Sequence, residues 1–406
     1  MLRLPQAQTP ARPHHGWRGA LVAGFAALLS ACAGGFPGND SVTTQAPPAT
    51  ASEPAAQNAI GAGQIKVGLL LPLTAAGNAG LAGQSMRNAA ELALAEFNNP
   101  NIQLLVKDDG GSAQGAQQAV QQALDEGAEI ILGPLFAQSV TPAAQIARSR
   151  GVPVIAFSTD SNVAGRGVYL LSFLPESDVD RIVEYAIAQG KRSFVAMLPD
   201  NAYGSVVEAE FKQVIARKGG RVVAIERYGA DASKMAESAR LIAQAAARAD
   251  ALFIPDSGDG VVAVAQALAT SGLNLKRLQV VGTGLWDDPR IFSEPAVDGG
   301  WYPAPDSAGY RAFSERYRSR YGQEPVRTAT LAYDAVALVA ALVKTQGAKR
   351  FAPETLTNGS GFAGIDGVFR FRADGSNQRG LAVLKVTPSG GQVIAPAPRT
   401  FGGSAT

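Results

Sequence analysis

Few residues in this chain have side chains suited to nucleophilic or metal chemistry. The 406 residues include one cysteine, Cys32, and two histidines, His14 and His15, all near the N-terminus. If the segment up to Ala31 is removed on export, the mature chain has no histidine. Ser-His-Asp and Cys-His catalysis, and zinc sites built on His or Cys, are then excluded. Acid/base work would fall to carboxylates, Lys, Tyr and hydroxyl groups.

Cys32 follows a leader with the features of a secretory signal. It contains three arginines and no acidic residue, and an apolar run extends from Gly19 to Leu29. This run of about 11 residues is too short to span a bilayer as a helix. The sequence Leu29-Ser30-Ala31-Cys32 resembles the lipobox of bacterial lipoproteins. We expect residues 1–31 to be a lipoprotein signal peptide and Cys32 to be lipidated. The alternative is an ordinary signal peptide cut elsewhere, which would leave a free buried thiol.

The expected mature chain is nearly neutral, and its first segment has the composition of a tether. The whole chain has 36 basic and 34 acidic residues, and the leader contains three of the basic ones, so 33 − 34 = −1. No basic stripe is present, so we expect no nucleic-acid partner and membrane contact only through lipid. Residues 32–63 are rich in Gly, Pro, Ala, Ser and Thr, which predicts a flexible spacer. Ala33, rather than Asp, favours sorting to the outer membrane.

The rest of the chain alternates apolar strands with amphipathic helices. A first set of strands is predicted at Ile65–Leu71, Ile102–Val106, Glu129–Leu132, Val154–Phe157 and Tyr169–Leu171, and a second at Ser193–Leu198, Arg221–Glu226, Ala251–Ile254 and Leu278–Val281. Gly367–Phe371 and Leu381–Val386 are two further strands with a turn at Ala373-Asp374-Gly375 between them. Repeated βα units predict an α/β fold of two doubly wound parallel-sheet lobes with an interlobe cleft.

Polar and aromatic residues follow several of these strands, where ligands bind in such sheets. The candidate ligand-binding residues, each in a strand-end loop or at a helix start, are Ser139, Ser158, Thr159, Asp160, Tyr203 and Trp286. Each has a structural alternative: Ser139 could cap its helix, residues 158–160 could form a turn, and Trp286 could plug a loop. Asp108-Asp109 indicates a turn and cap more than a catalytic pair.

Several segments resemble type I periplasmic binding proteins, nearest the leucine/isoleucine/valine-binding group. They are Ile65–Thr74, the G-A-E-I-I-L-G-P segment ending at Pro134, Gly151–Ile155, Asp200–Gly204 and Ala332–Ala335. The resemblance implies a non-enzymatic protein without metal or cofactor, and three crossovers, which we place near Pro175, Tyr302–Pro305 and Gly364–Gly367. The expected parts are an N-lobe of 64–174 plus 306–363, a C-lobe of 175–305 plus 364–390, and a tail of 391–406.

Three functions stay open at this stage, of which an enzyme working through carboxylates is the least favoured because the resembled family is non-enzymatic. The first is a solute-binding protein that holds a small polar ligand between its lobes for an ABC permease. The second is a regulator of peptidoglycan synthesis, because the G-L-L-L-P-L opening and Gly133-Pro134-Leu135 are similar to penicillin-binding-protein activator lipoproteins. Amino-acid binders of the resembled group commonly place an acid after the last C-lobe strand to hold the ammonium. Here that loop reads Gly282-Thr283-Gly284-Leu285-Trp286, which speaks against an amino-acid ligand.

Overall fold

The structure is a computed structural model that describes residues 59–98 and 100–401. The first lobe, called the N-lobe here, is built on a six-stranded sheet in the order β1-β3-β2-β4-β5-β6. All neighbouring pairs in it are parallel except β1 with β3. Its strands are β1 (Ala59–Ile60), β2 (Ile65–Leu71), β3 (Ile102–Asp108), β4 (Ile130–Leu132), β5 (Val154–Ala156) and β6 (Val168–Leu170).

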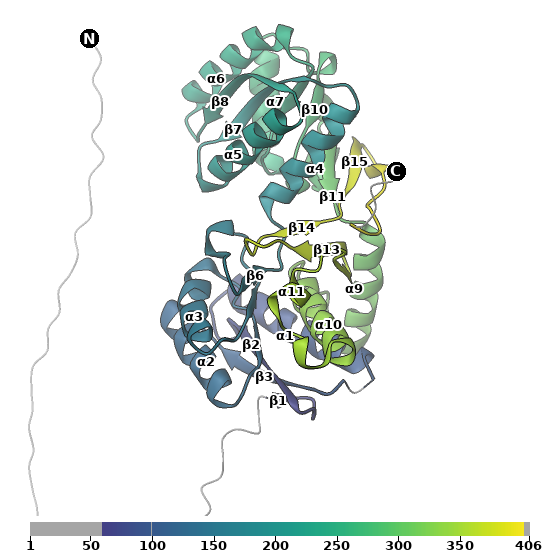
Figure 1. Cartoon of the computed structure of the whole chain (residues 1–406). Coiled ribbons are helices and arrows are strands. Elements are labelled where there is room, and N and C mark those ends of the chain that lie inside the picture. The colour runs from purple at the N-terminus through teal and green to yellow at the C-terminus, as the bar shows by residue number, and fades with distance from the viewer. Residues whose placement is uncertain (1–58, 99, 402–406) are drawn as a thin grey trace, which may run out of the picture. The chain divides into compact units, whose positions relative to one another are not determined.

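Helices cover both faces of this sheet (Figure 1). One face packs against α2 (Ala113–Asp125) and α3 (Ala137–Ser149). The other packs against α1 (Asn78–Glu96) and three elements from the C-terminal third, α9 (Ser307–Tyr321), α10 (Ala329–Thr345) and α11 (Pro353–Leu356). Burial on both faces explains why the central strands read as nearly continuous apolar runs.

The second lobe, the C-lobe, has a seven-stranded sheet in the order β16-β15-β11-β10-β9-β7-β8. Its strands are β7 (Ser193–Pro199), β8 (Arg221–Tyr228), β9 (Ala251–Phe253), β10 (Gln279–Val281), β11 (Trp301–Ala304), β15 (Ala382–Thr387) and β16 (Gly390–Ala395). Helices α4 (Pro175–Ala188) and α5 (Ala202–Arg217) cover one face, and α6 (Ala232–Ala245), α7 (Gly258–Thr270) and α8 (Pro289–Phe292) cover the other.

A small antiparallel sheet forms from strands that come between β11 and β15 of the C-lobe sheet along the chain. It contains β12 (Phe362–Gly364), β13 (Gly367–Phe371) and β14 (Asn377–Arg379). Phe369 and Phe371 pack into the same core as α1 and α10. The turn predicted at Ala373-Asp374-Gly375 forms, but it joins β13 to β14, and β15 then enters the C-lobe sheet. The chain thus reaches that sheet after Arg379, whereas we placed this crossover near Gly364–Gly367.

The predicted fold class is confirmed by this arrangement of parallel-dominated sheets and covering helices. The residue ranges that we assigned to the lobes stay a prediction. Cys32 and the leader lie outside the described residues. Within residues 59–98 and 100–401, no helix combines the length and apolar content needed to cross a bilayer.

Candidate functional site

A cavity of about 520 Å³ lies where the chain passes between the lobes, and we call it the hinge cavity. Its wall combines residues of the N-lobe, the C-lobe and the connecting segments. The residues used below are Thr159, Phe173, Asp178, Tyr203, Leu285, Pro305, Tyr310, Arg327, Arg379 and Leu381. Apolar and aromatic groups with a few converging charges are the usual composition of a small-molecule site.

Two of the six predicted site residues line this cavity, Thr159 and Tyr203. Asn201 caps α5 by accepting from the N–H of Gly204, which places Tyr203 in the first turn. The Tyr203 hydroxyl lies 2.8 Å from Oγ1 of Thr283 in the loop after β10. Burial raises the pKa of Tyr203, so its phenol is protonated at neutral pH. Its ring therefore borders the cavity in a fixed orientation.

The other three residues from the N-lobe loops do not border the cavity. Ser139 is fully buried in the first turn of α3, and its hydroxyl has no partner among the described residues. Ser158 is also buried, and its Oγ accepts from the backbone N–H of Asp160 at 3.1 Å. Asp160 in turn caps a short 3₁₀ turn by accepting from the N–H of Asn162. Their role in ligand binding stays a prediction.

Trp286 is part of the C-lobe core. Its side chain is fully buried, and its Nε1–H donates to the carbonyl of Ile254 at 2.9 Å. The ring lies so close to Gly282 and Gly300 that a Cβ on either glycine would meet it within 3 Å. The neighbouring Leu285, which is 45% exposed, lines the hinge cavity in its place.

Charged side chains from distant parts of the sequence gather at the floor of the hinge cavity. Arg327 forms a bidentate pair with Asp366, through bonds of 3.0 Å and 2.5 Å. Its guanidinium lies between the rings of Phe173 and Tyr310, 4.5 and 4.6 Å from their centroids. The double stacking and the ion pair fix Arg327 in place.

Arg379 lies beside this pair and is only 4% exposed. Its Nε–H donates to the carbonyl of Ser172 at 2.8 Å, and its guanidinium lies 4.5 Å from the centroid of Phe173. Within the described part of the chain, its Nη1 and Nη2 have no hydrogen-bond partner. Burial lowers the pKa of Arg379, while Asp366 and Asp334 oppose that shift.

Two carboxyl groups near Arg379 stay partly protonated at neutral pH because they are buried. Burial raises the pKa of Asp178 to about 7, against the N–H of Gly284, which donates to it at 2.9 Å. Burial also raises the pKa of Asp334 to about 7, against the N–H of Ile365 at 2.8 Å. At neutral pH each of these carboxyl groups is therefore protonated in a substantial fraction of molecules.

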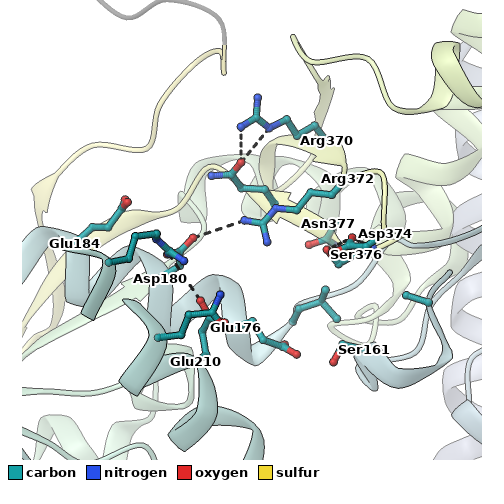
Figure 2. A pocket seen from close by; sticks show the side chains of 15 residues that line it. Ser161, Glu176, Asp180, Glu184, Glu210, Arg370, Arg372, Asp374, Ser376 and Asn377 are labelled. Carbon is teal, nitrogen blue, oxygen red and sulfur yellow. Dashed lines mark hydrogen bonds and ion pairs between the residues drawn. The ribbon is translucent and has the colours of Figure 1, made fainter. Parts of the chain in front are cut away.

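A second hollow, of about 790 Å³, lies against α4, α5 and the β13–β14 turn. Figure 2 shows that its labelled acids, Glu176, Asp180 and Glu210 among them, lie across from Arg372. Asp180 pairs with Arg217 and lies 3.6 Å from Arg372. Because Asp180 and Glu210 both lie within ion-pair distance of arginines, we interpret this hollow as a polar contact between elements and the hinge cavity as the candidate ligand site. No group of His, Cys, Asp and Glu within residues 59–98 and 100–401 is arranged to hold a metal ion.

Arg327, Arg379 and Asp178 line the hinge cavity but are not among the residues predicted from the sequence. Arg379 and Asn377 are two positions apart on β14 and so share a face. That spacing is the only local signal, and it does not show that the face is buried. The cavity forms from segments more than 200 residues apart, which only the crossovers bring together.

The comparison with protein families gives a match over most of the chain. The family described as "Periplasmic binding protein" matches residues 64–392. This chain belongs to the periplasmic binding protein family. Its nearest division is the type I, leucine/isoleucine/valine-binding-like class, as we predicted.

Several curated relatives of this chain are penicillin-binding protein activators. The activator LpoA of Shigella flexneri serotype X (strain 2002017) is 26% identical over 132 residues, which cover 32% of this chain and 19% of the relative. LpoA of Pantoea ananatis is 28% identical over 130 residues, which cover 32% of this chain and 19% of that relative. The match thus spans about a fifth of the length of these relatives.

Solved structures similar to this chain include proteins whose names refer to ABC transporters. A putative branched-chain amino acid ABC transporter protein from Rhodospirillum rubrum has a TM-score of 0.71 at 20% identity, covering 81% of this chain and 99% of that one. A branched-chain amino acid ABC transporter periplasmic ligand-binding protein from Burkholderia xenovorans has a TM-score of 0.63 at 20% identity. The match covers 83% of this chain and 96% of that one. At these identities the likeness shows the fold.

Proposed function

We propose that this chain is an exported, lipid-anchored solute-binding protein that holds a small polar ligand in the hinge cavity, in the manner of the substrate-binding proteins of ABC importers. The observation that carries the proposal is the hinge cavity itself. It is bordered by both lobes, and Tyr203 of the C-lobe and Arg379 of β14 both line it. A ligand there would contact both lobes at once, as the resemblance to solute-binding proteins implies.

The proposed site departs from that of an amino-acid binder in one respect. The loop after β10 has no carboxylate where the resembled group commonly holds the ligand ammonium, and Thr283 there bonds the Tyr203 hydroxyl instead. A buried unpaired ammonium is costly. We therefore expect weak or absent binding of leucine, isoleucine and valine.

A thermal-shift screen of the purified protein tests the proposal. Amino acids, organic acids, sugars and peptidoglycan fragments would be added singly. A true ligand at 100 times its Kd adds about 2.7 kcal/mol of stability, which is readily seen as a higher Tm. A shift with a branched-chain amino acid would contradict our expectation on ligand class, and silence across all classes would contradict solute binding.

The second candidate function is regulation of peptidoglycan synthesis from the outer membrane. The observation that favours it is the similarity to penicillin-binding protein activators, and an outer-membrane anchor would place the domain far from an inner-membrane importer. Co-purification of a peptidoglycan synthase, together with a silent solute screen, would favour this function. Co-purification of a permease would favour import.

A further inference from the structure

We propose that the end of the C-lobe sheet opposite the hinge cavity docks on a membrane surface of anionic phospholipid headgroups. The docking surface is a row of basic residues at the amino ends of four neighbouring strands, and we call it the basic edge. It consists of Lys191, Arg192, Arg221, Arg248 and Arg277. The proposal goes beyond the proposed function and does not depend on what the hinge cavity binds.

The basic edge is assembled by the sheet from separate segments of the sequence. Strands β10, β9, β7 and β8 are neighbours in this order and are all parallel, so their amino ends lie along one edge. Each strand has a basic residue at or just before its start: Arg277 before β10, Arg248 before β9, Lys191 and Arg192 before β7, and Arg221 at the start of β8. At about 4.8 Å between strands, the row extends over about 15 Å.

Hydrogen bonds show that residues of the basic edge are adjacent. The backbone N–H of Arg221 donates to the carbonyl of Arg192 at 2.8 Å, and Nη2 of Arg221 donates to the carbonyl of Arg248 at 3.2 Å. The four arginines are exposed, and Lys191 is half-buried. The positive charges therefore lie together at the protein surface.

Most of this positive charge is not neutralised by acids. Among the described residues, none of the five forms an ion pair with a carboxylate, and the side chains of Arg192 and Arg221 bond backbone carbonyls instead. Asp250 is the acid among them, and it accepts from the N–H groups of Arg192 and Ser193 at 2.9 Å. Five positive charges thus stand against one negative charge.

Two further cations at this end of the C-lobe are paired and are not part of the basic edge. Lys218 pairs with Glu184 at 2.5 Å, and Lys276 lies 3.9 Å from Asp298. The corresponding edge of the N-lobe sheet has no row of basic residues. The residues before β2, β3, β4, β5 and β6 are Gln64, Asn101, Glu129, Pro153 and Gly167. A basic edge is therefore not a requirement of the doubly wound sheet.

The form of the basic edge favours an extended charged surface over a compact ligand. Sites for small molecules are concave, and the hollow that reaches this edge is lined by only one of its five residues, Arg192. A stable protein interface has an apolar core, but the large apolar residues exposed in the described chain lie elsewhere: Leu81, Phe97, Leu285 and Val393. A row of separate cations without apolar residues matches the repeated negative charges of a phospholipid surface.

The expected spacer is long enough to permit this contact. The described chain begins at β1 of the N-lobe, and a segment of the length of residues 32–58, which lie outside the described residues, extends to at most about 90 Å. A domain of about 340 residues has a radius of gyration of about 20 Å. The C-lobe can therefore reach the membrane that holds the proposed lipid. This peripheral contact adds to the lipid, which the sequence indicated as the only membrane contact.

Co-sedimentation with vesicles tests this inference on the full chain carrying Cys32→Ala, which removes the proposed lipid. The vesicles are phosphatidylcholine alone, or phosphatidylcholine with one-third phosphatidylglycerol. We expect binding to the anionic vesicles at about 0.05 M salt and its loss at about 0.5 M salt, because salt screens exposed charges. Binding to phosphatidylcholine alone should be much weaker at both salt concentrations.

The test variant combines Lys191→Gln, Arg248→Gln and Arg277→Gln in the same chain. These side chains form no hydrogen bond or ion pair among the described residues, so their loss should not disturb the fold. Because each Lys or Arg near an anionic surface strengthens binding about fivefold, the variant should bind anionic vesicles at least about tenfold more weakly.

The matched control combines three substitutions of exposed N-lobe cations that also lack a side-chain partner within the described chain: Arg148→Gln, Arg166→Gln and Lys344→Gln. It removes the same charge and should leave vesicle binding unchanged. Equal weakening in both variants would show a response to net charge alone and would overturn the proposal. So would the absence of binding to anionic vesicles, or retention on peptidoglycan sacculi in its place. Solute binding in the hinge cavity is unaffected by any of these outcomes.

Discussion

At the scale of single residues, a buried carboxyl group just after β3 makes the stability of the fold depend on pH. Asp109 is fully buried, and its Oδ1 accepts from the N–H of Gly111 at 2.8 Å. Its Oδ2 has no partner within the described residues. Burial raises the pKa of Asp109 to about 6, and the negative charge of Asp108 adds to the rise. The folded protein thus holds a proton on Asp109 at a pH where the unfolded chain has lost it.

We predict that Asp109→Asn stabilises the protein at pH 8 relative to the wild type. Because the folded pKa lies above the unfolded value of 3.8, Asp109 contributes most to stability below pH 4, and this contribution of up to about 3 kcal/mol is lost as pH rises through 6. The asparagine amide of the variant does not ionise, so the variant does not lose this stability as pH rises. Urea denaturation at pH 4 and pH 8 measures the difference, which should grow with pH.

The exposed Asp125, which pairs with Arg150, provides the control. Asp125→Asn should change the free energy of unfolding by less than about 1 kcal/mol at either pH. An Asp109→Asn variant whose stability relative to the wild type is the same at both pH values would contradict the account of Asp109.

At the residue scale, sequence predicts best where position along the chain determines position in space. Tyr203 and Thr159 follow strand ends, and parallel sheets bring such ends to one edge; both line the hinge cavity. Arg379 could not be predicted, because its surroundings come from Ser172, Phe173 and Asp334, which only the tertiary fold assembles.

At the scale of elements, hydrogen bonds from the backbone and from the Asn377 side chain hold the β13–β14 hairpin against the end of β6. The N–H of Leu170 donates to the carbonyl of Gly375 at 2.8 Å, and Nδ2 of Asn377 donates to the carbonyls of Leu170 and Ser172, both at 2.8 Å. Gly375 has φ +86°, and a Cβ there would lie 2.1 Å from the carbonyl oxygen of Val168. The hairpin that positions Arg379 therefore requires glycine at the contact.

We predict that Gly375→Ala lowers the free energy of unfolding by about 3 kcal/mol or more, because backbone strain and a clash with backbone add together. Gly151→Ala is the matched control, since Gly151 has φ +69° but open space around it. It should cost only about 1 kcal/mol. Urea denaturation compares them, and equal losses would contradict the close contact at Gly375.

Element prediction was most accurate for the doubly wound lobes and least accurate for this hairpin. Apolar runs such as Ile65–Leu71 indicated buried strands, and β2 has the same bounds. β14 contains only Asn377, Gln378 and Arg379, a polar sequence without a strand pattern. Its strand conformation comes from pairing with β13 and from the contacts of Asn377, which no local signal shows.

At the scale of the whole molecule, the proposed lipid anchor determines where the binding domain works. Cys32→Ala should release the protein from membranes, because an N-terminal lipid is the proposed attachment. Fractionation with a carbonate wash measures this, with the wild type in the membrane fraction and the variant soluble. A variant that still sediments with washed membranes would contradict the anchor.

The central claim, that a solute binds in the hinge cavity, is tested most directly by calorimetry of Tyr203→Ala with a ligand from the solute screen. The Tyr203 ring borders the cavity, so its loss should weaken binding by about 1–3 kcal/mol. Tyr185→Ala is the control, because Tyr185 is half-buried in the same lobe but packs against Trp301 away from the cavity. The account predicts weaker binding in Tyr203→Ala and wild-type binding in Tyr185→Ala. Unchanged affinity in a folded Tyr203→Ala would contradict it and place the ligand elsewhere.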